Sequence, residues 1–182
     1  GGGDIWPCKP NTETGLKERG FEFLAEMERL HMIVDVSHLS DRGFWDIAEH
    51  STRPFAASHS NCRALAPHCR NLTDEMIRVM AEKGGLVGLN YCSGFLDDQP
   101  RPELCRSTTA LMARHAAHFK QVGGIEIIGL GSDFDGIGGK LEMGDCSKLP
   151  LLADALRKEG FTEDEVEQIF FRNAQRFFEE NL

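Results

Sequence analysis

The stretch MIVDVSHLS at residues 32–40 decides the fold, because a short apolar run there ends abruptly in polar residues. Its first five residues are rich in β-branched side chains, which is typical of a parallel strand buried on both faces. Residues 16–30 place apolar side chains at helical spacing, and Ser40 suits the N-cap of a helix over residues 41–50. The stretch therefore predicts one strand between two helices.

The same alternation repeats along the chain. Further apolar runs at residues 54–58, 86–90 and 125–130 predict three more strands. Thr73 caps a predicted helix that ends at a pair of glycines, and a longer helix is predicted over residues 105–121. Strands and helices in this order predict an α/β fold with a parallel sheet.

The C-terminal segment is predicted to be helical, since Thr162 and Glu165 have the spacing of a capping box. One face of this helix is expected to pack in the core through Val166, Ile169, Phe170, Phe177 and Phe178. No linker or low-complexity segment divides the chain, so we expect a single domain over residues 1–182.

Composition limits the function classes. The 182 residues carry a formal charge of −9 without a basic cluster, which argues against a nucleic-acid partner. No stretch approaches the roughly 20 apolar residues of a membrane segment. The glycine-rich start at residues 1–7 has the character of a loop, not of a signal peptide. The six cysteines are scattered without a Cys-x-x-Cys pair, so we expect reduced thiols and a cytoplasmic location.

In a parallel α/β fold, the functional residues lie at the carboxyl ends of the strands. His38 follows the first predicted strand, His59 the second, Asn90 the third and Asp133 the fourth. Neutral imidazoles and a carboxylate are the groups of a catalytic zinc site. From spacing alone, the alternative remains that each histidine is a hydrogen-bonded loop residue.

A glycine-rich loop offers a different interpretation. Gly129, Gly131 and the glycines at 136–139 would suit a nucleotide-binding domain. Their spacing does not form Gly-x-Gly-x-x-Gly, and the loop follows the last strand instead of the first. We rank this hypothesis below a metal site.

Four motifs of the chain are distinctive in combination: MIVDVSHLS at residues 32–40, ASHS at 57–60, RNL at 70–72 and GSDFDG at 131–136. Together they resemble the membrane dipeptidase (renal dipeptidase) family, peptidase family M19 of the amidohydrolase-like barrels. The similarity runs from about residue 14 to the C-terminus, where Arg172 and Asn173 open a segment like the family's final helix.

This resemblance implies a TIM-type (β/α)8 barrel with a binuclear zinc site that hydrolyses dipeptides. His38 and His59 match the two histidines that bind one of the two zinc ions. Asp133 matches the aspartate that moves a proton between the attacking water and the leaving amine. Arg70 matches the arginine that binds the terminal carboxylate of the substrate.

The chain departs from the family in lacking a His-x-Asp motif. In the family, this motif, a bridging glutamate and a further histidine lie earlier in the sequence. The elements that align here are strands five to eight, so we expect a half-barrel that is inactive alone. Its expected partners are the missing N-terminal half or a second copy in a homodimer. The alternative is a non-catalytic half-barrel that acts as an assembly or binding module.

Five other residues receive structural interpretations. Cys92 stands where many family members carry an aromatic, and we expect it to line the site. Asp35 lies inside a predicted strand, so we expect a buried carboxylate held by structural hydrogen bonds. His68 is expected to be an exposed loop residue. His115 and His118 are expected to be surface or packing residues.

Overall fold

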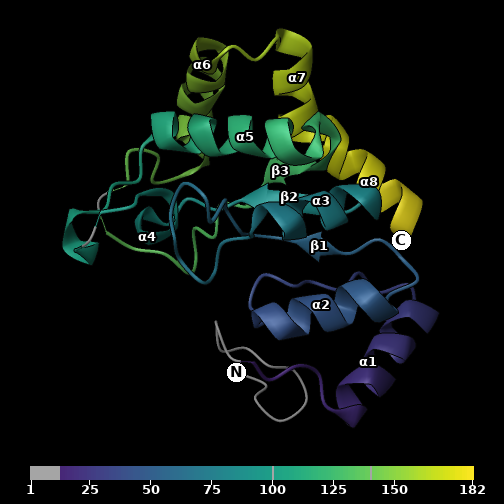
Figure 1. The fold of residues 1–182 in the computed structure, drawn as a ribbon. Coiled ribbons are helices and arrows are strands. Elements are labelled where there is room, and N and C mark those ends of the chain that lie inside the picture. The colour runs from purple at the N-terminus through teal and green to yellow at the C-terminus, as the bar shows by residue number, and fades with distance from the viewer. Residues whose placement is uncertain (1–12, 100, 140) are drawn as a thin grey trace.

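The computed structural model describes residues 13–99, 101–139 and 141–182, and the loop expected at residues 1–7 lies outside them. The described chain is an α/β structure, as predicted (Figure 1). In chain order its elements are α1 (Glu18–Arg29), α2 (Asp41–His50), β1 (Ala56–Ala57), α3 (Asp74–Glu82), β2 (Leu86–Leu89), α4 (Ser93–Leu96), η1 (Pro102–Leu104), α5 (Thr109–Gly123), η2 (Ile125–Ile127), β3 (Ile128–Leu130), η3 (Cys146–Lys148), α6 (Leu149–Glu159), α7 (Glu163–Glu167), the π-helical turn η4 (Gln168–Arg172) and α8 (Asn173–Asn181).

The sheet is parallel and has the order β1-β2-β3, with Ala56 opposite Leu86. The predicted strand at residues 32–36 is reduced to a single parallel bridge between Asp35 and Ala56. There Val36 N donates to Ala56 O at 2.8 Å, so the segment still lies along the outer edge of β1. The order of the strand segments in space therefore follows their order in the sequence.

Two predicted boundaries are wrong. Residues 125–127 form the 3₁₀ turn η2 instead of the start of a strand, because Gly124 ends α5 with a φ of 89° and Asn173 binds the carbonyl of Ile125 at 2.7 Å. The long helix begins at Thr109 and not at residue 105, since Thr108 caps it by accepting from Leu111 N at 3.2 Å. Before this cap, Ser107 forms a parallel bridge with Leu141 in a later loop.

The core lies between the sheet and its helices. α5 packs against α3 and α6, and Figure 1 shows α6 and α7 beyond α5, with α1 and α2 beside β1 at the other end of the sheet. The largest side chains in this layer, including Ile77, Met80, Met112, Phe119 and Leu152, are fully buried. This packing fixes the sheet and therefore the loops at its carboxyl edge.

The predicted capping box of Thr162 and Glu165 is confirmed. Phe177 is fully buried, but Phe178 is 46% exposed, so its predicted core position is wrong. Consecutive helical residues point about 100° apart, and one narrow face cannot hold both. No helix in the described ranges is long and apolar enough to cross a membrane.

Candidate active site

The structure brings His38 and His59 together. They follow neighbouring strand segments, and their Nε2 atoms lie 2.9 Å apart. The ring centroids are 4.8 Å apart, with the ring planes inclined by 56°. His38 is exposed and His59 is half-buried, so the pair lies at an accessible edge of the sheet.

Arg70 lies beside this pair, on the loop that follows β1. Its side chain is buried, and Nη2 lies 3.3 Å from His38 Nε2. The guanidinium stacks over Phe95, 5.3 Å from the ring centroid. Nη1 is buried and has no hydrogen-bond partner among the described residues. Arg70 thus keeps one donor group unused next to His38.

The charges at this edge influence one another. Burial lowers the pKa of His38, and the charges of Arg70 and His59 lower it further, while Asp35 and Asp133 oppose the change. Burial also lowers the pKa of Arg70, again against the carboxylates of Asp133 and Asp35. Asp133 therefore lies within electrostatic reach of both basic residues.

Asp133 lies in the turn that follows β3. Its φ is 61°, in the left-handed region, and its carbonyl accepts from Gly136 N at 2.9 Å. Asn90 donates from Nδ2 to Asp133 Oδ2 at 3.1 Å and to His59 O at 3.4 Å. One asparagine side chain thus connects the predicted catalytic carboxylate with the loop that carries His59.

Asp35 is exposed, so its predicted burial is wrong, because its strand segment lies at the edge of the sheet and, within the described residues, pairs only with β1. Its predicted structural hydrogen bonds are confirmed. The carboxylate accepts from Ser58 N at 2.9 Å, Ser37 N at 3.1 Å and Ser58 Oγ at 2.5 Å. Desolvation alone would raise the pKa of Asp35, but the hydrogen bonds from Ser58 and Ser37 outweigh it and lower the pKa.

Three buried asparagines, none of them predicted as site residues, hold the loops together. Asn61 Oδ1 accepts from Asn90 N at 3.0 Å, and Asn71 Oδ1 accepts from Asn61 N at 3.2 Å. Asn61 and Asn71 also donate to Phe95 O at 3.2 and 2.9 Å. The one sequence signal was Asn90 directly after a strand. Asn61 and Asn71 gave no such signal, because their contacts with Asn90 and Phe95 join segments that are distant in sequence.

His68 and Cys92 flank the same loops. His68 is half-buried against Phe95, with ring centroids 4.6 Å apart, so its predicted exposure is wrong. Its Nδ1 accepts from Arg70 N at 3.1 Å, which orients the arginine backbone. Cys92 is half-buried, and its N donates to Asn90 Oδ1 at 2.6 Å. The described cysteines are free thiols, and Cys8 lies outside the described residues.

Gly88 and Gly131 both pack closely against the backbone carbonyl of Ser58. A Cβ on Gly88 would lie 1.9 Å from Ser58 O, and a Cβ on Gly131 would lie 1.8 Å from the same atom. Real Cβ atoms do not approach an oxygen so closely, so both positions require glycine. This packing gives Gly131 a structural role that needs no bound phosphate.

His115 is buried on α5 and has a packing role, as predicted. Its Nδ1 accepts from Cys62 N at 3.1 Å, and its Nε2–H donates to Leu96 O at 3.1 Å. Burial lowers the pKa of His115 to about 4. His118, one turn further on, pairs with Asp74 at 2.8 Å. These histidines therefore hold α5 against neighbouring elements.

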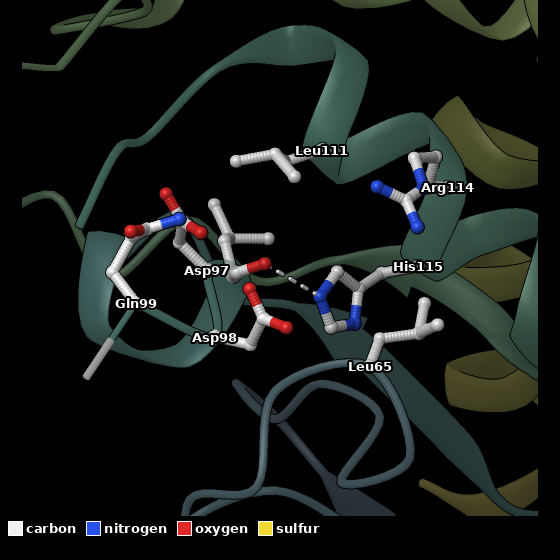
Figure 2. A pocket seen from close by; sticks show the side chains of 8 residues that line it. Leu65, Asp97, Asp98, Gln99, Leu111, Arg114 and His115 are labelled. Atoms are coloured by element: carbon white, nitrogen blue, oxygen red, sulfur yellow. Dashed lines mark hydrogen bonds between the residues drawn. The ribbon is translucent and has the colours of Figure 1, made fainter.

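A pocket of about 220 Å³ lies between α5 and the loop after α4. Figure 2 shows Arg114 and His115 reaching it from α5, opposite Asp97 and Asp98 of that loop. None of the four predicted site residues lines this pocket. We therefore place the candidate site at the strand ends. In the described part of the chain, no group of three or more His, Cys, Asp or Glu side chains is arranged to hold a metal ion.

The histidine pair, the buried arginine and the aspartate thus lie at the carboxyl edge of a parallel sheet, where α/β folds place their functional groups. The family model of membrane dipeptidase (peptidase family M19) matches residues 7–181. The chain therefore belongs to the membrane dipeptidase family, a family of metallopeptidases, and the predicted resemblance is confirmed.

Three similar proteins illustrate the relationship. A protein in the pqqA 5′ region of Klebsiella pneumoniae is 38% identical over 171 residues, covering 94% of this chain and 63% of that protein. An uncharacterized dipeptidase of Schizosaccharomyces pombe is 35% identical over 166 residues, covering 90% and 39%. The structure of a metallo peptidase from Rhodobacter sphaeroides, liganded with a phosphinate mimic of the dipeptide L-Ala-D-Ala, has a TM-score of 0.88 and 35% identity, covering 97% and 50%. The chain thus spans less than two thirds of each of these relatives.

Proposed function

We propose that this chain, as one domain, supplies strands five to eight of a TIM-type barrel whose complete active site hydrolyses dipeptides with two zinc ions. The observation that carries the proposal is the 2.9 Å approach of His38 Nε2 to His59 Nε2 at the ends of neighbouring strand segments. The dipeptide mimic bound by the Rhodobacter sphaeroides relative supports the substrate class. The cytoplasmic location stays a prediction.

The histidine pair fits a zinc ion. Two nitrogen ligands of one tetrahedral zinc lie roughly 3.3 Å apart, given Zn–N bonds of about 2.0–2.1 Å. The observed separation of 2.9 Å needs only a small opening to admit the ion. In this proposal the remaining zinc ligands come from the other half of the barrel.

In the proposed hydrolysis, the side chains at the carboxyl edge of the sheet have separate roles. Two bound zinc ions would activate water and polarise the peptide carbonyl. The Asp133 carboxylate accepts a proton from the attacking water and returns it to the leaving amine nitrogen. Asn90 holds that carboxylate through Oδ2. Arg70 uses its free Nη1 to bind the terminal carboxylate of the dipeptide, a contact that a guanidinium makes well.

The test combines metal binding with turnover. Zinc binding is measured by titration calorimetry on the wild-type chain and on His38→Asn and His59→Asn. His31→Asn serves as the matched control, because His31 is exposed and its φ of 59° suits asparagine. We expect the control to bind zinc like the wild type and both site variants to lose binding. Equal binding by all four proteins would contradict the proposed ligands.

Dipeptide hydrolysis is then assayed with zinc, for the chain alone and for the chain mixed with the complementary half of a relative. We expect little or no turnover alone and turnover in the mixture. Robust turnover by the lone chain would show that the site is complete without the other half.

A second candidate function is a non-catalytic half-barrel that assembles with another chain. The observation in its favour is the open sheet: within the described residues, β3 pairs only with β2, and the segment at Asp35 pairs only with β1. Unpaired strand edges promote association. Light scattering after size exclusion tests for a homodimer, and a monomer at all concentrations would contradict it.

A further inference from the structure

Asp35, Ser58 and His59 form a continuous chain of hydrogen bonds. Ser58 Oγ lies 2.5 Å from Asp35 Oδ2 and 2.7 Å from His59 Nδ1. A third neighbour, Ser37 Oγ, is more distant at 3.4 Å. The opposite nitrogen of the same ring, Nε2, faces His38. One carboxylate is thus connected through one hydroxyl to one side of the His59 ring.

The proton positions in this series of hydrogen bonds follow from counting the donors and acceptors. An ionised carboxylate only accepts, and a serine hydroxyl has a single proton to give. Asp35 receives two backbone N–H groups and the short contact from Ser58, so the Ser58 proton points to Asp35 Oδ2. Ser58 Oγ can then only accept from His59, and Nδ1 must carry the ring proton.

The orientation of Asp35 is also fixed. Its Oδ1 accepts from the backbone N of both Ser58 and Ser37, at 2.9 and 3.1 Å. The two backbone N–H groups need an acceptor, and Oδ1 supplies it. The other carboxylate oxygen, Oδ2, therefore faces Ser58 Oγ. His59 itself is held from the backbone side, where its N donates to Ser37 Oγ at 2.9 Å.

We propose that Asp35 is a positioning residue that acts through Ser58 to hold His59 in the Nδ1–H tautomer, in which Nε2 has a lone pair that faces His38 and can bind a metal ion. The consequence for metal binding rests on the function proposed above. Partners of this kind fix the ring orientation of histidine ligands, and their loss typically weakens metal affinity about 10–100-fold.

Replacing Asp35 by asparagine gives the sharpest test, because the side chain keeps its shape while one acceptor oxygen is replaced by a donor NH₂ group. The two backbone N–H groups require the amide oxygen at the Oδ1 position, so the amide nitrogen would face Ser58 Oγ. Ser58 must then donate to His59 Nδ1, and the ring proton moves to Nε2. We therefore expect Asp35→Asn to convert His59 to the opposite tautomer.

Ser58→Ala and Ser60→Ala form a matched pair on either side of His59. Ser58→Ala removes the relay, whereas Ser60 Oγ has no hydrogen-bond partner among the described residues. Long-range ¹H–¹⁵N spectra of the ¹⁵N-labelled 182-residue chain identify the protonated ring nitrogen without metal. The His59 signal is assigned by its loss in His59→Asn, and amide spectra of each variant verify that it folds.

We expect the Nδ1–H form of His59 in the wild type and in Ser60→Ala, a mixture of tautomers in Ser58→Ala, and the Nε2–H form in Asp35→Asn. An unchanged tautomer in both Ser58→Ala and Asp35→Asn would overturn the inference. Zinc titration of the same proteins should show affinity about 10–100-fold lower in these two variants than in Ser60→Ala.

The two readouts separate this inference from the proposed function. If the tautomers change as expected but no variant, including the wild type, binds zinc, the relay stands and the metal function fails. If the wild type binds zinc and the relay variants bind it equally well, the metal function stands and the positioning role of Asp35 is refuted.

Discussion

Asn90 donates to Asp133 Oδ2 at 3.1 Å and thereby joins the end of β2 to the loop that follows β3. The same side chain accepts from Cys92 N at 2.6 Å, and Asn90 is fully buried. Buried hydrogen bonds of this kind leave unsatisfied groups when one partner is removed. The position of the proposed catalytic carboxylate therefore depends on a residue from the neighbouring strand.

Asn90→Ala should lower the free energy of unfolding by about 1–3 kcal/mol, because it removes a buried side chain whose half-buried partners in three loops lose their hydrogen bonds. Urea unfolding measures the change. Gln175→Ala, on the exposed face of α8, is the control and should stay within about 0.5 kcal/mol of the wild type. A loss as small as that of the control would show that the asparagine network contributes little.

The stability of the fold should fall in mild acid because of His115. Burial lowers its pKa to about 4 in the folded chain, from an ordinary value of 6.5. The unfolded state therefore binds the extra proton first, and stability is lost as the pH falls from 6.5 towards 4. The shift corresponds to about 3 kcal/mol at most.

His115→Gln should flatten this dependence, which urea unfolding at several pH values between 7 and 5 would reveal. His118→Gln is the comparison, since His118 lies one turn away on the same helix. If both variants and the wild type lose stability in parallel, the acid sensitivity comes from other groups.

Gly88→Ala and Gly131→Ala should each destabilise the chain by about 3 kcal/mol or more, because the added methyl group would collide with the Ser58 carbonyl. Gly138→Ala is the matched control, since no atom lies within 4 Å of a Cβ there. Thermal unfolding compares the three. Midpoints equal to that of the control would mean that the strands can separate easily at Ser58.

Arg70→Lys should raise KM for dipeptides roughly tenfold or more in the reconstituted enzyme, because lysine lacks the planar pair of donors that grips a carboxylate. The effect should be smaller for dipeptide amides, which lack the C-terminal carboxylate. Arg78→Lys, at an exposed position of α3, provides the control. An equal KM change for acids and amides would argue that Arg70 acts on the fold and not on the substrate.

Local signals in the sequence predicted the elements well. The caps at Ser40 and Thr73 are confirmed by bonds from Gly43 N and Met76 N at 3.0 and 3.2 Å. The predicted ligands His38 and His59 meet, because parallel strands end at the same edge. Such features depend only on neighbours in sequence or on the direction of the strands.

Contacts between distant loops could not be predicted in this way. Residues 125–127 read as a strand, yet Asn173 holds this turn by donating to Ile125 O at 2.7 Å and Ile128 O at 2.9 Å. The packing of the buried Arg70 against Phe95 likewise joins a loop to helix α4, which is distant from it in sequence. No spacing in a single stretch of sequence encodes these pairings.

The left-handed backbone of Asp133 affects how substitutions there must be interpreted. Only glycine, asparagine and aspartate adopt this conformation readily, and other residues lose about 1–2 kcal/mol. An alanine at this position would therefore remove the carboxylate and strain the turn at once, so its phenotype would have two causes. Asparagine separates them, since it removes the charge and tolerates the backbone. Asp133→Asn is therefore the substitution that tests the role of the carboxylate separately from the conformation of the backbone.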